Sequence, residues 1–248
     1  MLYPSPFIGK LIYIYWIYIY VWVGIKYTVL ALSAATLLGF CDCIGLRAAA
    51  PECQPVNTVG DFDVATYISS RWYIQQQMEV SYLPLTWNYC VFAEYTQFQS
   101  PNVNGYSYGV HNYAEEVDGT VHDSNIEIPG GGICAAGADK NDPAKLKVAP
   151  CFVPKLFAGP YWILEYSEEE GYALVSGGQP TIPTTGGKCK LGNGVNNSGL
   201  WIFTRAQQRD DALVQKVRAL ADAQGFDVSV LNDVSQVNCA PVEGTVVA

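Results

Sequence analysis

Eight cysteines are the residues of this chain best able to form covalent bonds, and six of them follow Pro51. No two cysteines are spaced as Cys-x-x-Cys, so the sequence predicts neither a redox pair nor a zinc knuckle. An even number in an exported chain indicates three disulfides formed in an oxidising compartment. Spacing alone does not choose the pairs. The six are Cys53, Cys90, Cys134, Cys151, Cys189 and Cys239.

The two histidines have no serine or cysteine placed for nucleophilic catalysis. We interpret His111 and His122 as surface or rim residues, with haem ligation by His111 as an alternative that a Soret band would reveal. The run Gly130–Gly132 lacks the following Gly-Lys-Ser/Thr of a phosphate-binding loop, so we predict a flexible loop. We therefore expect no catalytic residue, no metal and no cofactor, and we predict that the chain is not an enzyme.

The charge balance argues against nucleic acid as a partner. The 248 residues carry 14 Lys and Arg against 23 Asp and Glu, a net charge of −9. Phosphate backbones are bound by clustered cations, and here the cations are few and scattered. The hydrophobic share of 50% is enough to fill a core, which excludes a disordered chain.

Residues 1–50 are predicted to be a targeting region. Two apolar runs, Leu11–Ile25 and Tyr27–Cys41, flank Lys26, and the small residues before Pro51 suit cleavage near Ala50. The alternative is a retained membrane anchor, because about 20 apolar residues suffice to cross a bilayer. Cleavage would leave residues 51–248 as one domain, secreted or in an organellar lumen, and retention would associate the chain with a membrane. N-terminal sequencing of the mature protein decides between them.

Short stretches rich in aromatic and β-branched residues, separated by turn signals, predict an all-β domain built as an up-and-down barrel or a sandwich. One stretch has helical spacing instead and predicts a helix from Asp210 to Gln224. The predicted strands are Trp72–Val80, Cys90–Gln99, Tyr106–Glu115, Val121–Ile128, Lys145–Val153, Tyr161–Tyr166, Tyr172–Ser176 and Leu200–Thr204.

Alternation along the second predicted strand assigns its faces. Glu94 belongs on the solvent face, so Val91, Ala93 and Tyr95 are predicted to point inward. A face that alternates small and aromatic residues suits a barrel with internal space, although it also suits a filled core.

Several segments resemble the lipocalin family. Phe62-Asp63-Val64 followed by Arg71-Trp72-Tyr73 resembles the start of the lipocalin barrel, with Ser70 where the family has glycine. Asp142–Val148 and Leu200–Arg205 resemble the middle and the last strand of apolipoprotein-D-like members. The resemblance runs collinearly from Cys53 to Cys239. Tyr166–Gly171 departs from the family pattern, which puts a close relationship in doubt but not the barrel.

The resemblance implies an eight-stranded antiparallel up-and-down barrel with one C-terminal helix packed on its wall. It also implies that Arg205 stacks on Trp72 in a structural role. By position, it implies the disulfides Cys53–Cys189 and Cys90–Cys239. Cys134 and Cys151 then remain, and we predict that they pair with each other.

The function implied by the resemblance is binding and transport of a small hydrophobic ligand, such as a fatty acid, a sterol, or a retinoid- or carotenoid-like compound. A role in lipid metabolism or the response to reactive oxygen species is also implied. The alternative is a carotenoid-modifying enzyme of the same fold, such as violaxanthin de-epoxidase. We expect a monomer or weak dimer, and Asn196 begins a glycosylation sequon. The predicted ligand-binding residues are Tyr95 and Trp201 from the resemblance, and Val91, Ala93, Phe203 and Trp162 as their neighbours.

Overall fold

The computed structural model of this chain describes residues 52–239. The predicted targeting region, with its alternatives of cleavage and anchoring, lies outside the described residues. Within the described residues, no helix is both long and apolar enough to cross a membrane.

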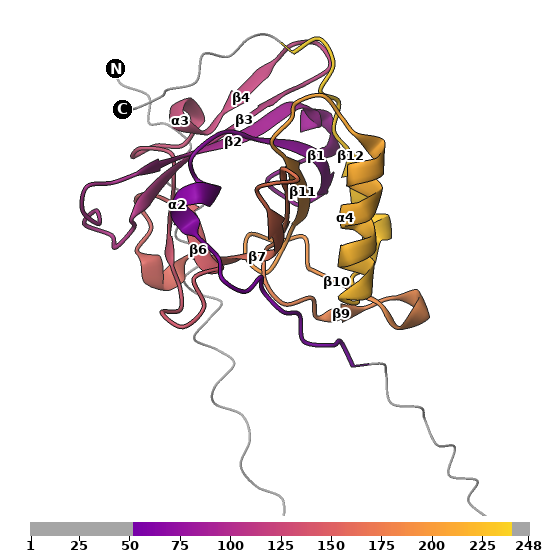
Figure 1. Cartoon of the computed structure of the whole chain (residues 1–248). Coiled ribbons are helices and arrows are strands. Elements are labelled where there is room, and N and C mark those ends of the chain that lie inside the picture. Colours follow the sequence, from indigo (N-terminus) through magenta and orange to yellow (C-terminus); the bar gives the residue numbers. More distant parts are fainter. Residues whose placement is uncertain (1–51, 240–248) are drawn as a thin grey trace, which may run out of the picture. The chain divides into compact units, whose positions relative to one another are not determined.

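Eight strands form a closed antiparallel barrel. Each strand pairs with the next one around the ring, and β11 pairs back with β1, so that Ile74 lies opposite Phe203. Figure 1 shows the ring viewed from one end, with α2 at that end and α4 outside the wall. This is the predicted architecture. The barrel strands are β1 (Trp72–Met78), β2 (Tyr89–Gln97), β3 (Tyr108–Glu115), β5 (Ile133–Gly137), β6 (Lys145–Pro150), β7 (Gly159–Ser167), β8 (Tyr172–Ser176) and β11 (Leu200–Thr204).

Shorter elements decorate the ring. β4 (Val121–Asp123) pairs with the end of β3, β12 (Leu231–Asp233) pairs with the second half of β1 beyond its pairing with β2, and β9 and β10 form a separate pair. The remaining bounds are β9 (Ile182–Pro183), β10 (Cys189–Lys190), α2 (Val64–Tyr67), α3 (Ser124–Glu127), α4 (Asp211–Ala223) and the 3₁₀ turns η1 (Leu85–Trp87), η2 (Lys155–Phe157), η3 (Thr185–Gly187) and η4 (Val228–Val230).

The prediction for the fourth strand was wrong. Only Val121–Asp123 of the predicted Val121–Ile128 is extended, because the Asp123 side chain accepts a hydrogen bond from the Asn125 amide and starts the helical turn α3. The fourth barrel strand is β5, Ile133–Gly137. Its sequence, Ile-Cys-Ala-Ala-Gly, is short of the β-branched and aromatic residues by which strands are recognised.

The predicted helix is confirmed as α4, with Asp210 as its N-cap. The Asp210 carboxylate accepts hydrogen bonds from the amides of Ala212 and Leu213, which satisfies two of the free donors at the helix start. The apolar stripe of α4 is buried against the outer side of β8 and β11. The side chains of this outer cluster include Val214, Val217, Ala221, Leu174, Leu200 and Ile202.

Within residues 52–239 three disulfides are present, and they join the pairs that we expected: Cys53–Cys189, Cys90–Cys239 and Cys134–Cys151. The first ties the segment before the barrel to β10, and the second ties the segment after β12 to β2. The third links β5 to the residue after β6, with a Cα–Cα distance of 4.9 Å. Disulfides are typical of proteins that fold in an oxidising compartment.

Replacing Cys134 and Cys151 together by alanine should lower the free energy of unfolding by about 3 kcal/mol, because a bridge closing a loop of this length restricts the unfolded chain by that amount. Urea denaturation under non-reducing conditions measures the change. A non-reducing peptide map in which Cys134 is bonded to any other cysteine would contradict the pairing.

Candidate functional site

Alternation along each strand separates the inward side chains from the outward ones, and the two largest apolar clusters lie on opposite sides of the wall. One lies between the wall and α4, and the other lies inside the ring. The interior cluster is built from seven of the eight barrel strands, all except β5. Its buried barrel residues are Trp72, Ile74, Val91, Ala93, Ala114, Leu146, Ile163, Ala173, Val175 and Phe203.

Five of the six predicted ligand-binding residues lie in this interior cluster. Val91, Ala93 and Phe203 are buried there, and Tyr95 and Trp201 are half-buried against the same cluster. Val91, Ala93 and Tyr95 therefore point inward, as predicted for the second strand. The space that these side chains line is the candidate site.

Trp162 is the exception. It was predicted to line the interior, but it lies on the outer face of the barrel. Its neighbours Tyr161 and Ile163 belong to the interior cluster, so alternation turns Trp162 outward, where it packs on the cluster beneath α4. The Lys145 ammonium lies 5.1 Å from the centre of the Trp162 ring. The sequence did not reveal the face because both faces of β7 carry aromatic residues.

One end of the barrel is closed by Arg205 and Trp72. The Arg205 guanidinium carbon lies 3.6 Å from the centre of the Trp72 ring, which is fully buried. The same guanidinium donates hydrogen bonds to the carbonyl oxygens of Ser70, Thr66 and Tyr67, and to the Glu168 carboxylate. One cation thus joins β1, β11, the turn after β7 and the α2 segment.

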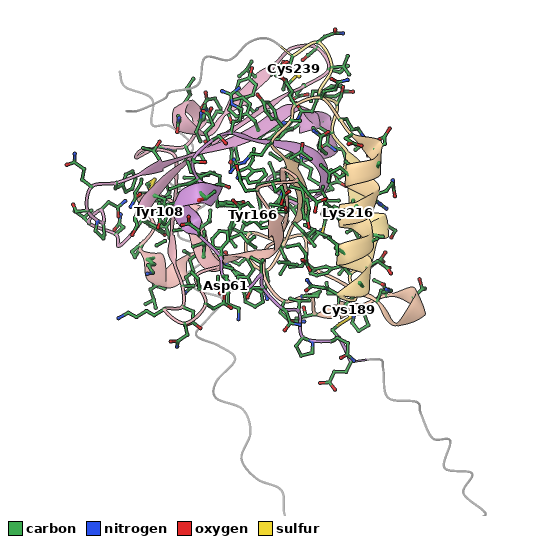
Figure 2. The ribbon with its side chains drawn as sticks, viewed as in Figure 1. Asp61, Tyr108, Tyr166, Cys189, Lys216 and Cys239 are labelled. Atoms are coloured by element: carbon green, nitrogen blue, oxygen red, sulfur yellow. A yellow bond between two sulfur atoms is a disulfide. The ribbon has the colours of Figure 1, made fainter. Side chains whose placement is uncertain are left out.

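The α2 segment brings a layer of aromatic rings to this end. Asp63 caps α2 by accepting a hydrogen bond from the Ala65 amide, and the Trp72 indole donates to the Tyr67 carbonyl oxygen. The rings of Phe62, Tyr67 and Tyr166 meet mostly edge to face, with centroids 5.3 to 5.7 Å apart. Tyr166 lies inside the ring of strands, whereas Lys216 lies on α4 outside it (Figure 2).

Three tyrosine hydroxyls meet inside the barrel above this layer. The Tyr161 hydroxyl lies 2.8 Å from that of Tyr67 and 2.7 Å from that of Tyr95. Burial raises the pKa of Tyr67 and Tyr161 well above the ordinary value and raises the pKa of Tyr95, so all three stay neutral at physiological pH. Sequence reasoning identified Tyr95 alone, since nothing in the sequence connects Tyr67, on a four-residue helix, with β2 and β7.

Within the eight barrel strands, alternation and pairing place no Asp, Glu, Lys, Arg or His side chain on the interior face. Besides the hydroxyl cluster, polar side chains on this face include amides: Gln77 is buried and donates to Asn88, and Asn112 faces inward because it pairs with Ala93. The additional strand β4 brings His122 to the same side, since His122 pairs with the interior residue Ala114.

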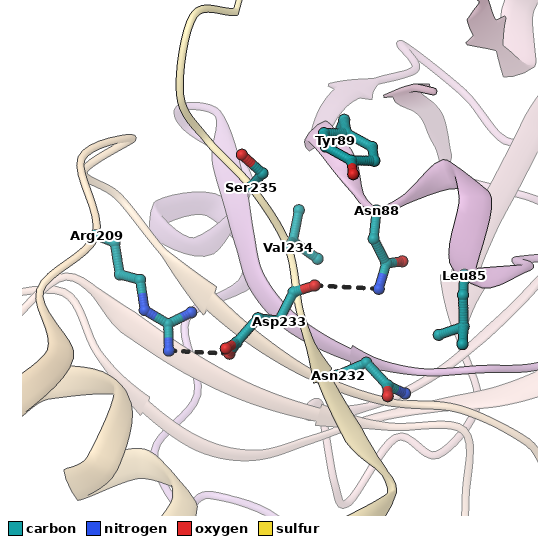
Figure 3. Close-up of a pocket in the computed structure, with 8 residues that line it drawn as sticks. All are labelled: Leu85, Asn88, Tyr89, Arg209, Asn232, Asp233, Val234 and Ser235. Atoms are coloured by element: carbon teal, nitrogen blue, oxygen red, sulfur yellow. Dashed lines mark hydrogen bonds and ion pairs between the residues drawn. The ribbon is translucent and has the colours of Figure 1, made fainter. Parts of the chain in front are cut away.

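A surface cleft of about 420 Å³ lies where β12 joins the barrel, and its polar groups bind one another. Arg209 is 3.0 Å from the Asp233 carboxylate, and the Asn88 amide donates to the Asp233 carbonyl oxygen (Figure 3). Hydrogen bonding from Gln76, with Arg209 nearby, lowers the pKa of Asp233. We interpret this cleft as a structural seam. Its lining also includes Leu85, Tyr89, Asn232, Val234 and Ser235.

Both histidines contact carboxylates, but on different faces of the wall. His111 pairs with Glu94 on the outer face, whereas His122 of β4 pairs with the interior residue Ala114 and so lies on the inner face. His111 lies 3.5 Å from Glu94 and 3.1 Å from Asp123, and both histidine side chains are only 15% exposed, less than we expected of surface residues. His122 contacts Glu116 and Glu127 and stacks on Trp87 with ring centroids 3.7 Å apart. Within residues 52–239, no cluster of three or more His, Cys, Asp and Glu side chains is arranged to hold a metal ion.

Comparisons with known proteins give the fold little added support. No protein-family model and no curated protein sequence matches the chain. Among solved structures, lobster apocrustacyanin A1 is 18% identical, over 70% of this chain and 79% of its own, with a TM-score of 0.47.

Insecticyanin of the tobacco hornworm is 14% identical, over 75% of this chain and 87% of its own, with a TM-score of 0.49. The cockroach allergen Per a 4 is 14% identical, over 75% and 95%, with a TM-score of 0.47. Similarity at this level does not establish the fold or the site. The strand pairing defines the fold, and the side-chain contacts inside the ring define the candidate site.

Replacing Arg205 by alanine should lower the free energy of unfolding by roughly 2–4 kcal/mol, because the stacking on Trp72 and several charged hydrogen bonds are lost together. Arg205→Lys should recover less than half of that, since it keeps the charge but not the planar fork. Chemical denaturation measures both. A cost below about 0.5 kcal/mol for Arg205→Ala would show that the contact does not hold the barrel end.

The buried tyrosines also predict a loss of stability in alkali. Burial raises the pKa of Tyr161 above the ordinary 10.0, so its contribution is present below pH 10 and is lost as the pH rises and the unfolded phenol ionises. The stability of Tyr161→Phe should fall less steeply above pH 10 than that of the wild type. The ionisation of the tyrosines in the folded wild type is followed by phenolate absorbance. If all of them ionise together near pH 10, the prediction is contradicted.

Proposed function

We propose that this chain is a lipocalin and that it binds a small hydrophobic ligand inside the barrel. The closed antiparallel ring, the helix on its wall and the stacking of Arg205 on Trp72 support the family assignment. The apolipoprotein-D-like relationship, with its implied role in lipid metabolism and the response to reactive oxygen species, is the finer part of this proposal. It rests on the sequence resemblance.

One observation carries the binding proposal: several inward-facing side chains are not fully buried. Tyr95, Tyr161 and Trp201 pack on the interior cluster and yet retain contact with solvent. Val148 pairs with Ala135 and alternates with the interior residue Leu146, and it too is half-buried. In a filled core, side chains of this size lose their contact with water. Partial exposure on the inward face therefore supports an interior space that is open to solvent.

The lining gives such a space its preference for apolar ligands. Val91, Ala93 and Phe203 form one side of it and Ile163 and Val175 another. A ligand that leaves water for these walls gains roughly 25 cal/mol for each Å² of apolar surface buried. Fatty acids, sterols, retinoids and carotenoids all offer surface of this kind.

Binding is favoured over the enzymatic alternative. A carotenoid-modifying reaction needs an acid or base beside the bound ligand. Within the eight barrel strands the ionisable interior-facing groups are tyrosines, and burial raises the pKa of Tyr95 and Tyr161 and of Tyr67 on α2. His122, which β4 adds to the interior side, contacts the carboxylates of Glu116 and Glu127. We propose a binding protein that acts as a monomer or weak dimer in a secreted or luminal compartment. Membrane association through the N-terminal segment is the alternative.

Ligand binding is tested by filling the space. We expect a fluorescent apolar probe, N-phenyl-1-naphthylamine, to bind saturably to the wild type at micromolar concentration. Val148→Trp should weaken that binding at least roughly tenfold, because an indole would occupy the volume that the probe needs. Fluorescence titration and competition by retinol, palmitate and cholesterol measure the effect.

Lys147→Trp is the matched control, since Lys147 is adjacent on β6 and faces outward. It should bind the probe like the wild type. Saturable binding that is equal in both variants would place the probe outside the barrel, and no saturable binding to the wild type would refute the proposed function.

A further inference from the structure

The tyrosine cluster inside the barrel has one more hydrogen-bond donor than its two close contacts use. From this we infer that Tyr95 and Tyr161 anchor a neutral oxygen atom, a hydroxyl or carbonyl, at one end of the apolar ligand. The inference rests on the proposed function and specifies the chemical class of the ligand.

Counting protons shows the surplus. Three hydroxyls bring three O–H groups, and the contacts of Tyr161 with Tyr67 and with Tyr95 use two of them. Tyr67 and Tyr95 also affect each other's pKa through a hydrogen-bond contact of their own, which is not one of the two short contacts. Since the hydroxyl contacts of 2.8 and 2.7 Å number two, one O–H has no short contact with another hydroxyl and is available to donate to an acceptor oxygen that enters the barrel.

The position of the cluster decides which hydroxyls a ligand can reach. Tyr67 is fully buried, whereas the side chains of Tyr95 and Tyr161 are half-buried and belong to the interior face. The nearby Tyr166 is not part of the cluster, because its hydroxyl donates to the Glu168 carboxylate. An acceptor oxygen that enters the barrel thus meets Tyr95 and Tyr161 first.

The surroundings favour a neutral acceptor over a carboxylate. The cation nearest to the cluster is Arg205, which faces Glu168 at 2.9 Å and whose donors are engaged with that carboxylate and with backbone carbonyl oxygens. It stacks on Trp72 at the closed end of the barrel. A carboxylate beside the tyrosines would be buried without a counter-ion, which costs far more than burying an alcohol or a ketone that accepts a hydrogen bond.

The test uses four flexible ligands that differ only at one end or near it: 1-dodecanol, 2-dodecanone, dodecanoate and dodecane. Each displaces N-phenyl-1-naphthylamine from the full-length protein, and the probe affinity is measured separately for every variant. Tyr95→Phe and Tyr161→Phe should weaken dodecanol and dodecanone by roughly threefold to tenfold, the range expected for one hydrogen bond, and should leave dodecane within about twofold. Dodecanoate at pH 8 should bind the wild type at least roughly tenfold more weakly than dodecanol.

Tyr172→Phe is the matched control, because Tyr172 lies in the outer cluster beneath α4, where Lys216 approaches its ring. It should leave all four affinities unchanged. The inference is overturned if dodecanoate equals dodecanol, if no dodecyl compound displaces the probe, or if the phenylalanine variants affect dodecane as much as dodecanol. The proposed function itself fails only if the probe does not bind the wild type, which separates the two outcomes.

Discussion

Closure of the sheet, by pairing of β11 with β1, is the constraint on which the rest of this structure depends. A closed antiparallel sheet has no free edge, and alternation along each strand then sends every second side chain into one enclosed space. Because Ile74 lies opposite Phe203 at the seam, the interior face continues without interruption from the last strand to the first. The helix α4 packs on the outer face of β8 and β11, and the interior is shaped by barrel side chains together with Phe62 and Tyr67 of the α2 segment.

The two faces of the wall carry different chemistry. The outer side holds His111 with the carboxylates of Glu94 and Asp123. The inner side of the eight barrel strands is apolar apart from neutral amides and hydroxyls, and β4 adds His122 opposite the interior residue Ala114. Arg205 stands at the boundary, where Glu168 balances its charge, so that it closes the barrel end without leaving a free cation for the interior.

Much of this arrangement could be predicted from the sequence, where local patterns carry the information. The helical stripe of α4, and the alternation that turns Val91, Ala93 and Tyr95 inward, follow from spacing alone. The disulfide pairs and the Trp72–Arg205 contact came from the family resemblance instead. β5 was missed because Cys-Ala-Ala-Gly gives no strand signal, and Trp162 was misplaced because aromatic residues occupy both faces of β7.

The tyrosine cluster was beyond local patterns altogether. Tyr67, Tyr95 and Tyr161 lie on α2, β2 and β7, and only the closed ring brings their hydroxyls together. An interior cluster of this kind is created by topology, so its residues can be identified only when the strands are placed in space.

The most direct test of whether the barrel binds a neutral ligand is mass spectrometry of the organic extract of the natively purified protein. The extract of the wild type is compared with the extract of the Val148→Trp variant. The account predicts a small apolar molecule with a hydroxyl or carbonyl oxygen, near one equivalent in the wild type and depleted in the variant. An extract that holds no such molecule, or holds it equally in both proteins, would contradict the account.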